Sequence, residues 1–218
     1  MARTRMLLCT AVTSALLAAP LSAQGARRVQ DWQYRWYWGV KGGLMTYTLP
    51  TAGTVVTPQF GADWLITERR AALYVGFSQS LAAETDTFAI SGLAGTNNGV
   101  NFDGVKRLQI GVVAMVGNGN LQPYVGGGFT IHILSNARST TTNPSQGVVD
   151  AIDDAASQAF IFGMAGLQYR MGRKLALFAS YQYTPQGKGY MLQGGSSNFE
   201  GGVRYALLGS REEDPTRR

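Results

Sequence analysis

Eight separate runs of this sequence alternate apolar residues with polar residues or glycine, and this alternation constrains the fold more than any other feature. The runs cover residues 36–48, 55–66, 71–80, 105–116, 121–134, 159–171, 175–183 and 198–207. A period of two residues is typical of strands, because successive side chains point to opposite faces of a sheet. No run after residue 23 approaches the roughly 18 consecutive apolar residues expected of a membrane-spanning helix. The sequence therefore predicts an all-β chain with eight strands.

The connections between these runs alternate in length. The second, fourth and sixth have about four residues each, whereas the third, fifth and seventh have roughly 14 to 23, as in transmembrane barrels with short periplasmic turns and long outer loops. Residues 83–103, 135–157 and 184–197 are predicted as these long loops, with a short helix over 148–156. We therefore expect an eight-stranded antiparallel up-and-down transmembrane β-barrel.

The two ends of the chain have the composition of an exported protein. Arg3 and Arg5 precede an apolar run that is shorter than the roughly 20 residues of a membrane anchor, and Leu21-Ser22-Ala23 has the small-residue pattern of a cleavage site. The predicted organisation is a signal peptide, a periplasmic arm, an outer-membrane barrel and a polar tail, over residues 1–23, 24–35, 36–208 and 209–218. The predicted location is the outer membrane of a Gram-negative-type bacterium.

Charge and cysteine content exclude several other classes of protein. The net charge is +6 in the full chain, but the basic residues are scattered and do not form the gathered patch that a nucleic-acid surface needs. The single cysteine, Cys9, lies within the predicted signal peptide, so the mature chain is expected to have no disulfide. Asp150, Asp153 and Asp154 lack the ligand spacing of a calcium loop, and we expect no cofactor and no metal site.

Periodicity defines two faces but does not say which face points inward. A soluble carrier of the lipocalin type would also be an eight-stranded barrel, with its apolar face inside. Glycine favours the membrane orientation, because Gly76, Gly111, Gly128 and other glycines share the charged face. The narrow lumen of an eight-stranded barrel needs such small residues, whereas a solvent-facing surface does not.

Aromatic residues of the apolar face lie near the strand ends, as in the interfacial girdles of membrane barrels. The predicted girdle residues are Trp36, Trp64, Tyr169, Tyr183, Phe199 and Tyr205.

The last run, NFEGGVRYAL, places Glu200, Gly202, Tyr205 and Leu207 in the spacing of a closing strand of outer-membrane barrels. Together with the glycine-tyrosine motif QPYVGGG at residues 122–128, it makes the chain resemble the OmpA-like barrel superfamily, including its OmpW-type members. The resemblance covers residues 36–207. It implies three kinds of contact for a monomer: outer-membrane lipid, lipopolysaccharide, and the barrel assembly machinery, which would bind the closing strand from Glu200 to Leu207.

Charged residues on the inner face predict a polar network inside the barrel, because buried charges need partners. Glu200 is expected at its centre, and membership of Asp63 is left open. The predicted members are Lys41, Arg107, Arg170, Arg204, Glu200 and, held by neighbouring polar groups, His132.

We expect a structural or surface-interaction role without catalysis, and three alternatives remain. Phe162, Met164 and Phe178 on the inner face would suit passage of small apolar molecules in the OmpW manner. The second alternative is the soluble carrier. The third is a PagL-like lipid A deacylase, because residues 132–137 resemble the His-x-Ser-Asn-Ala motif of that family. Here His132 and Ser135 are three residues apart, so in a regular strand they point to opposite faces.

Overall fold

The computed structural model describes residues 35–68, 70–81, 83–90, 98–117, 119–171, 174–187 and 190–209. The predicted signal peptide over 1–23 lies outside the described residues. The same holds for the predicted arm up to residue 34 and for the tail beyond residue 209.

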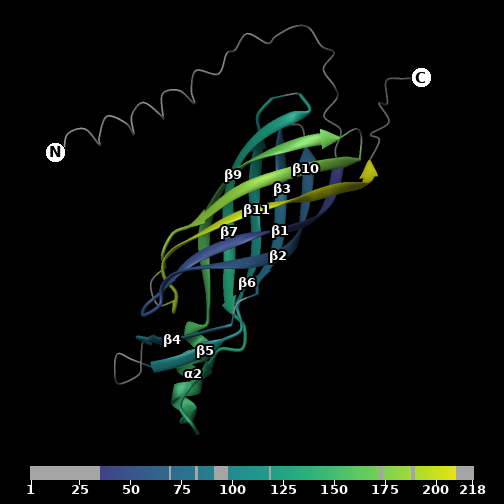
Figure 1. The fold of residues 1–218 in the computed structure, drawn as a ribbon. Helices are drawn as coiled ribbons and strands as arrows, with labels where there is room; N and C mark the ends of the chain where they lie inside the picture. Colours follow the sequence, from purple (N-terminus) through teal and green to yellow (C-terminus); the bar gives the residue numbers. More distant parts are fainter. Residues whose placement is uncertain are drawn as a thin grey trace, which may run out of the picture. The chain divides into compact units, whose positions relative to one another are not determined.

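Eight strands form a closed antiparallel barrel in which each strand pairs with the strands before and after it, and β1 pairs with β11 (Figure 1). This confirms the predicted fold. The barrel strands are β1 (Arg35–Leu49), β2 (Gly53–Glu68), β3 (Ala71–Ser80), β6 (Val105–Met115), β7 (Leu121–Leu134), β9 (Ser157–Met171), β10 (Leu175–Thr184) and β11 (Gln193–Gly209).

The face that carries charge and glycine points into the barrel, and the apolar face points outward. In β6, for example, Arg107 and Gln109 are buried, whereas Leu108 and Ile110 are each more than half exposed. The glycines allow neighbouring backbones to approach closely, since a Cβ atom at Gly128 would overlap the carbonyl oxygen of Ile110. Every one of the eight strands contributes large exposed apolar side chains to the outer surface.

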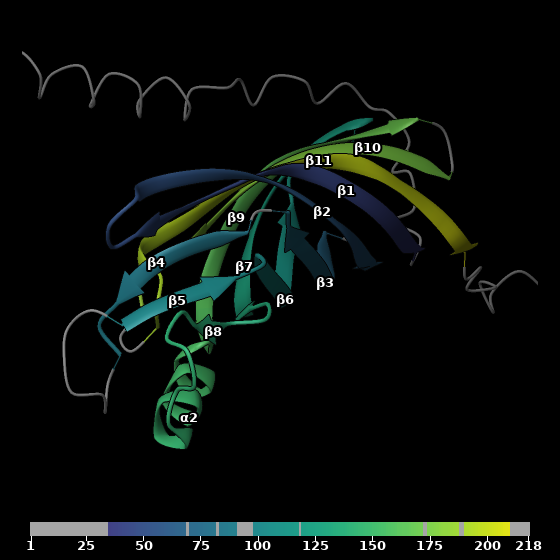
Figure 2. The same ribbon diagram turned by 60° about the horizontal axis from the view of Figure 1, so that its bottom comes forward.

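The prediction that residues 83–103 form a loop is wrong. They contain β4 (Glu84–Phe88) and β5 (Asn98–Phe102), which pair with each other, and β5 also pairs with the two-residue β8 (Arg138–Ser139) (Figure 2). The apolar residues of this segment alternate as they do in a strand, and they are buried by residues from other connections. Strand β11 also begins earlier than predicted, so the predicted loop 184–197 is shorter.

The predicted helix is present as α2 (Gln146–Ala155), which differs from the expected range by one or two residues at each end. Val148, Ala151, Ile152 and Ala155 lie on its apolar side and pack against the residues of the other outer connections. None of the described residues forms a helix that is long and apolar enough to cross a membrane.

One apolar cluster lies inside the barrel near one end, and a second lies at the other end, where barrel strands meet the outer connections. We call the barrel end that carries residues 50–52, 83–90, 98–104, 135–156, 185–187 and 190–192 the loop end, and the opposite end the turn end. The turn-end cluster fills the lumen from several strands and consists of Tyr37, Leu65, Ala72, Tyr74, Val113, Met115, Tyr124, Phe162, Met164, Ala176 and Ala206. The loop-end cluster, which we call the cap, consists of Met45, Tyr47, Leu49, Phe88, Ile90, Val100, Phe102, Val105, Leu134, Ile152, Ala156, Met191 and Leu192.

Candidate functional site

A buried ion cluster lies in the lumen between these two apolar layers. Glu200 of β11 accepts a hydrogen bond from Lys41 Nζ of β1 at 2.9 Å and one from Arg107 Nη2 of β6 at 2.5 Å. All three side chains are about 1% exposed. One carboxylate therefore bridges two cations from two non-adjacent strands of the barrel wall, and buried charges need such partners.

Neutral polar side chains complete the surroundings of this cluster. Gln182 Nε2 donates to Glu200 Oε2 at 2.9 Å, and Lys41 Nζ also donates to the Tyr74 hydroxyl at 2.9 Å. Arg107 Nη2 donates to Gln59 Oε1 at 3.1 Å and to Ser78 Oγ at 2.8 Å. These contacts join β1, β2, β3, β6, β10 and β11 across the lumen, so the cluster ties the barrel wall together from inside.

A second, separate ion pair lies toward the turn end. Arg204 donates from Nη2 to Asp63 Oδ2 at 2.5 Å and from Nη1 to Gln168 Oε1 at 2.9 Å, and its guanidinium lies 3.8 Å from the centroid of the Phe178 ring. This differs from the predicted single network centred on Glu200. The strand register places Gly39 opposite both Arg204 and Asp63, and a Cβ atom at Gly39 would overlap the Asp63 carboxylate. Arg204 therefore pairs across a glycine with Asp63.

Two other predicted members also lie outside the Glu200 cluster. Arg170 is partly exposed near the turn end, where its backbone N–H donates to the Asn120 carbonyl oxygen, and its side-chain Nε has no hydrogen-bond partner among the described residues. His132 is 2% exposed, and its Nε2 atom likewise has no partner there. It contacts rings instead, with Phe160 at 5.0 Å and Tyr190 at 6.2 Å between centroids.

The residues of the deacylase-like motif do not form a nucleophile and base pair. Ser135 Oγ and His132 Nε2 are both buried, and neither has a hydrogen-bond partner among the described residues. Asn136 adopts a positive φ of 54° and its side chain donates to Asp103 at 2.7 Å, so the motif turns the chain out of β7. A general base must lie within hydrogen-bond reach of its nucleophile, and this geometry does not support acyl transfer.

The four outer connections pack together and close the loop end. Thr140 N donates to Gly99 O at 2.9 Å, and Asp103 N donates to Ser135 O at 2.8 Å, so the second and third outer connections are hydrogen bonded. The centroids of the Phe88 and Phe102 rings are 6.4 Å apart within the cap. The loop end is therefore a small packed unit with its own apolar core.

Asp86 of β4 attaches the first outer connection to this unit. Its carboxylate accepts hydrogen bonds from the backbone N–H groups of Thr51 at 3.0 Å, Ala52 at 3.1 Å and Thr87 at 2.6 Å. Burial acts to raise the pKa of Asp86, but the hydrogen bonds from Thr51, Ala52 and Thr87 outweigh it and hold the pKa below its ordinary value.

This attachment should depend on pH in one direction. Because the pKa of folded Asp86 is lowered, the carboxylate stabilises the connection above the unfolded pKa of about 4 and loses this effect as pH falls through the folded pKa. We expect the amide proton shifts of Thr51 and Ala52, measured by NMR, to titrate with a midpoint below the ordinary pKa of an aspartate. Asp86→Asn should abolish this titration, and Asp150→Asn on exposed α2 should leave it unchanged. A midpoint at the ordinary aspartate value would contradict the assignment.

The aromatic residues predicted as girdles lie on the outer face of the barrel. Trp36 and Trp64 are partly exposed near the turn end, while Tyr169, Tyr183, Phe199 and Tyr205 are each more than 40% exposed. The prediction missed Trp38, whose ring stacks on Trp64 with centroids 5.3 Å apart.

The described residues contain no group of His, Cys, Asp and Glu side chains arranged to hold a metal ion. In α2, the Asp150 carboxylate accepts a hydrogen bond from Gln146 at 2.9 Å.

Comparison with solved structures shows the same fold in two bacterial proteins. Neisserial surface protein A is 11% identical over 78% of this chain and 96% of its own, with a TM-score of 0.53. The attachment invasion locus protein Ail of Yersinia pestis, solved with the heparin analogue sucrose octasulfate, is 12% identical over 80% of this chain and 99% of its own, with a TM-score of 0.50. No protein-family model and no curated protein sequence matches the chain. The chain therefore has the fold of a small outer-membrane β-barrel.

Proposed function

We propose that the protein resides in a bacterial outer membrane with its loop end directed outward, and that it has a structural or surface-interaction role without catalysis. The observation that carries this proposal is a closed barrel whose outer face is apolar on all eight strands. Such a face is stable against hydrocarbon and unstable in water, and a closed sheet leaves no unpaired backbone groups in lipid.

The packing of the interior supports a barrel without an open channel. The cap covers the loop end, the Glu200 cluster crosses the middle of the lumen, and the turn-end cluster fills the other end. Eight strands enclose a space that side chains can fill. The exposed part of the cap, with its sheet and helix, is then the surface available to partners outside the cell.

The partners implied by this placement are lipid, lipopolysaccharide and the barrel assembly machinery. Tyr183 and Phe199 are exposed toward the loop end and suit contact with the interfacial region of the outer leaflet. The segment of β11 from Glu200 to Leu207 carries the closing-strand spacing through which the assembly machinery would bind. We propose a monomer, because the barrel closes on its own strands.

Two kinds of experiment test the placement in lipid: folding of the unmodified mature chain, and a lysine substitution on the outer face. The mature chain should fold in phosphatidylcholine vesicles, migrate differently on gels before and after boiling, and fail to stay dispersed in plain buffer. Ile110→Lys should lower the free energy of unfolding in vesicles by about 2–4 kcal/mol, because Ile110 lies midway along β6 and is 53% exposed. The control Thr141→Lys, at an exposed position outside the barrel strands, should leave it unchanged. A folded, dispersed protein in plain buffer would refute the proposal.

The alternative function is passage of small apolar molecules in the OmpW manner. It is favoured by the turn-end cluster, where Phe162 and Met164 give the lumen an apolar lining. Liposomes that contain the folded protein would then take up an apolar dye faster than empty liposomes. This result would favour the transport function and contradict a barrel without a channel.

A further inference from the structure

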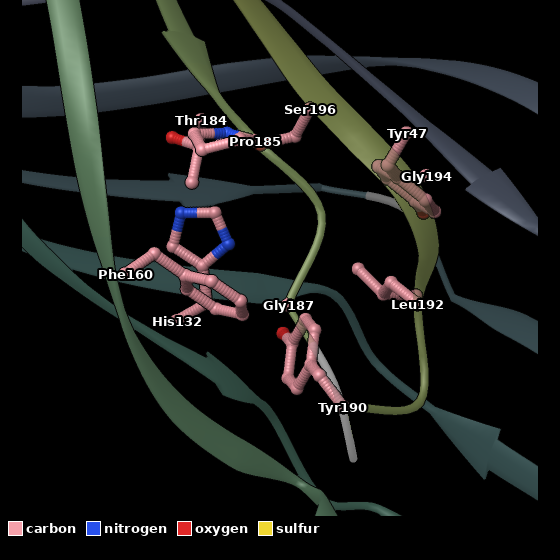
Figure 3. A pocket seen from close by; sticks show the side chains of 10 residues that line it. All are labelled: Tyr47, His132, Phe160, Thr184, Pro185, Gly187, Tyr190, Leu192, Gly194 and Ser196. Atoms are coloured by element: carbon pink, nitrogen blue, oxygen red, sulfur yellow. The ribbon is translucent and has the colours of Figure 1, made fainter.

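A small pocket lies beneath the cap, between the aromatic residues of the loop end and the polar interior. His132 of β7 and Phe160 of β9 form one side, and Tyr190 of the last outer connection lies across from them (Figure 3). Thr184 of β10 and Ser196 of β11, which are register partners, contribute the opposing hydroxyl groups. These residues therefore come from four strands and one outer connection.

The buried polar atoms of this pocket are unsatisfied. The hydroxyls of Tyr47, Thr184, Tyr190 and Ser196 and the Nε2 atom of His132 are inaccessible to solvent and have no hydrogen-bond partner among the described residues. Buried polar groups are nearly always paired with protein or with a bound species, so these atoms are expected to contact a bound species. Each hydroxyl can donate a hydrogen bond, as can an imidazole protonated at Nε2. No carboxylate lines the pocket.

The neighbouring interior carries an excess of positive charge. The Glu200 cluster holds two cations, Lys41 and Arg107, against one carboxylate, whereas the second pair of Arg204 and Asp63 is balanced. Arg107 is the register partner of His132, so the excess charge adjoins the pocket. Ser196 and Glu200 also share the inner face of β11. A buried excess charge favours a counter-ion nearby.

The size of the pocket limits what it can hold. Its enclosed part has room for about one water-sized particle, which is too small for a sugar or a phosphate. We propose that this pocket binds a single halide-sized anion, such as chloride, through the unpaired hydroxyls and the His132 imidazole. The anion satisfies the buried donors and offsets the positive charge of the Lys41 and Arg107 side chains.

Halide-dependent stability tests the site in the full mature chain folded in detergent micelles. The thermal unfolding midpoint should be a few degrees higher in sodium chloride than in sodium gluconate at equal ionic strength, because a ligand that binds only the folded state stabilises it. Equal ionic strength removes general screening as a cause, and gluconate is too large for the pocket. Crystals grown in sodium bromide should show an anomalous peak between Thr184, Ser196 and His132. Equal midpoints in the two salts, or a water at that position in the bromide crystals, would overturn the proposal.

Different variants test the contribution of the hydroxyl donors and that of the excess positive charge. The double variant Thr184→Val with Ser196→Ala should lose the chloride effect, while Thr67→Val, which removes a buried hydroxyl at the turn end, should keep it. Lys41→Met removes the excess charge and should weaken chloride binding about tenfold, whereas Glu200→Gln doubles that excess and should strengthen binding about tenfold. For each variant we compare its own thermal unfolding midpoints at different chloride concentrations. A general loss of stability lowers all of these midpoints and is therefore not mistaken for a loss of chloride binding. Equal chloride dependence in the two charge variants would show that the site does not sense the cluster.

Discussion

Glu200→Ala is expected to lower the free energy of unfolding of the folded barrel by about 3–5 kcal/mol. The substitution leaves Lys41 and Arg107 buried without a carboxylate, and both are about 1% exposed. Removing one partner of a buried pair costs more than the pair contributes as a whole, because the remaining charges stay desolvated. The effect should appear in urea-induced unfolding in vesicles, followed by tryptophan fluorescence.

Asp103→Ala is the matched control for this experiment. Asp103 is also an acidic residue with a hydrogen-bond partner, Asn136, but that contact is exposed at the loop end. We expect its removal to change the free energy of unfolding by less than about 0.5 kcal/mol. If Glu200→Ala and Asp103→Ala had equal effects, the Glu200 cluster would not stabilise the barrel.

The pairing of ions in the lumen shows what the sequence could and could not predict. The two-residue period placed Lys41, Arg107, Arg204 and Glu200 on one face, and the structure has all four inside the barrel. It could not give the partner of each charge, because partners depend on the register between strands that are far apart in the sequence. Arg204 and Asp63 are separated by 141 residues and meet because Gly39 lies between them without a side chain.

The cap was missed for a different reason. Residues 83–103 are mostly polar, and their few apolar residues suggested no core in isolation. Two short alternations were present, Phe88 with Ile90 and Val100 with Phe102, and these residues are buried in the structure. Their burial depends on Met191, Leu192 and Ile152 from later connections, which no local pattern could place against them.

Phe102→Ala should open the cap without unfolding the barrel. Phe102 is fully buried in the cap, and removal of a buried phenylalanine ring costs about 3–5 kcal/mol because it leaves a cavity. The barrel strands keep their hydrogen-bonded ladders, so the loss should fall on β4, β5 and β8. We expect amide hydrogen exchange in β4 and β5 to accelerate by roughly a hundredfold or more, with little change in β1 and β11.

Trypsin provides an independent measure of the same opening, since Arg138 is exposed in β8 and held there by pairing with Asn101 of β5. A site in a paired strand resists cleavage until the pairing opens, so Phe102→Ala should be cut at Arg138 much faster than the unmodified protein. Phe129→Ala, which removes the same ring from the outer face of β7 where it is 65% exposed, should not change this rate. If both variants were cut at the rate of the unmodified protein, the pairing of β5 with β8 would not depend on the packing of Phe102 in the cap, and the loop end could not act as one surface.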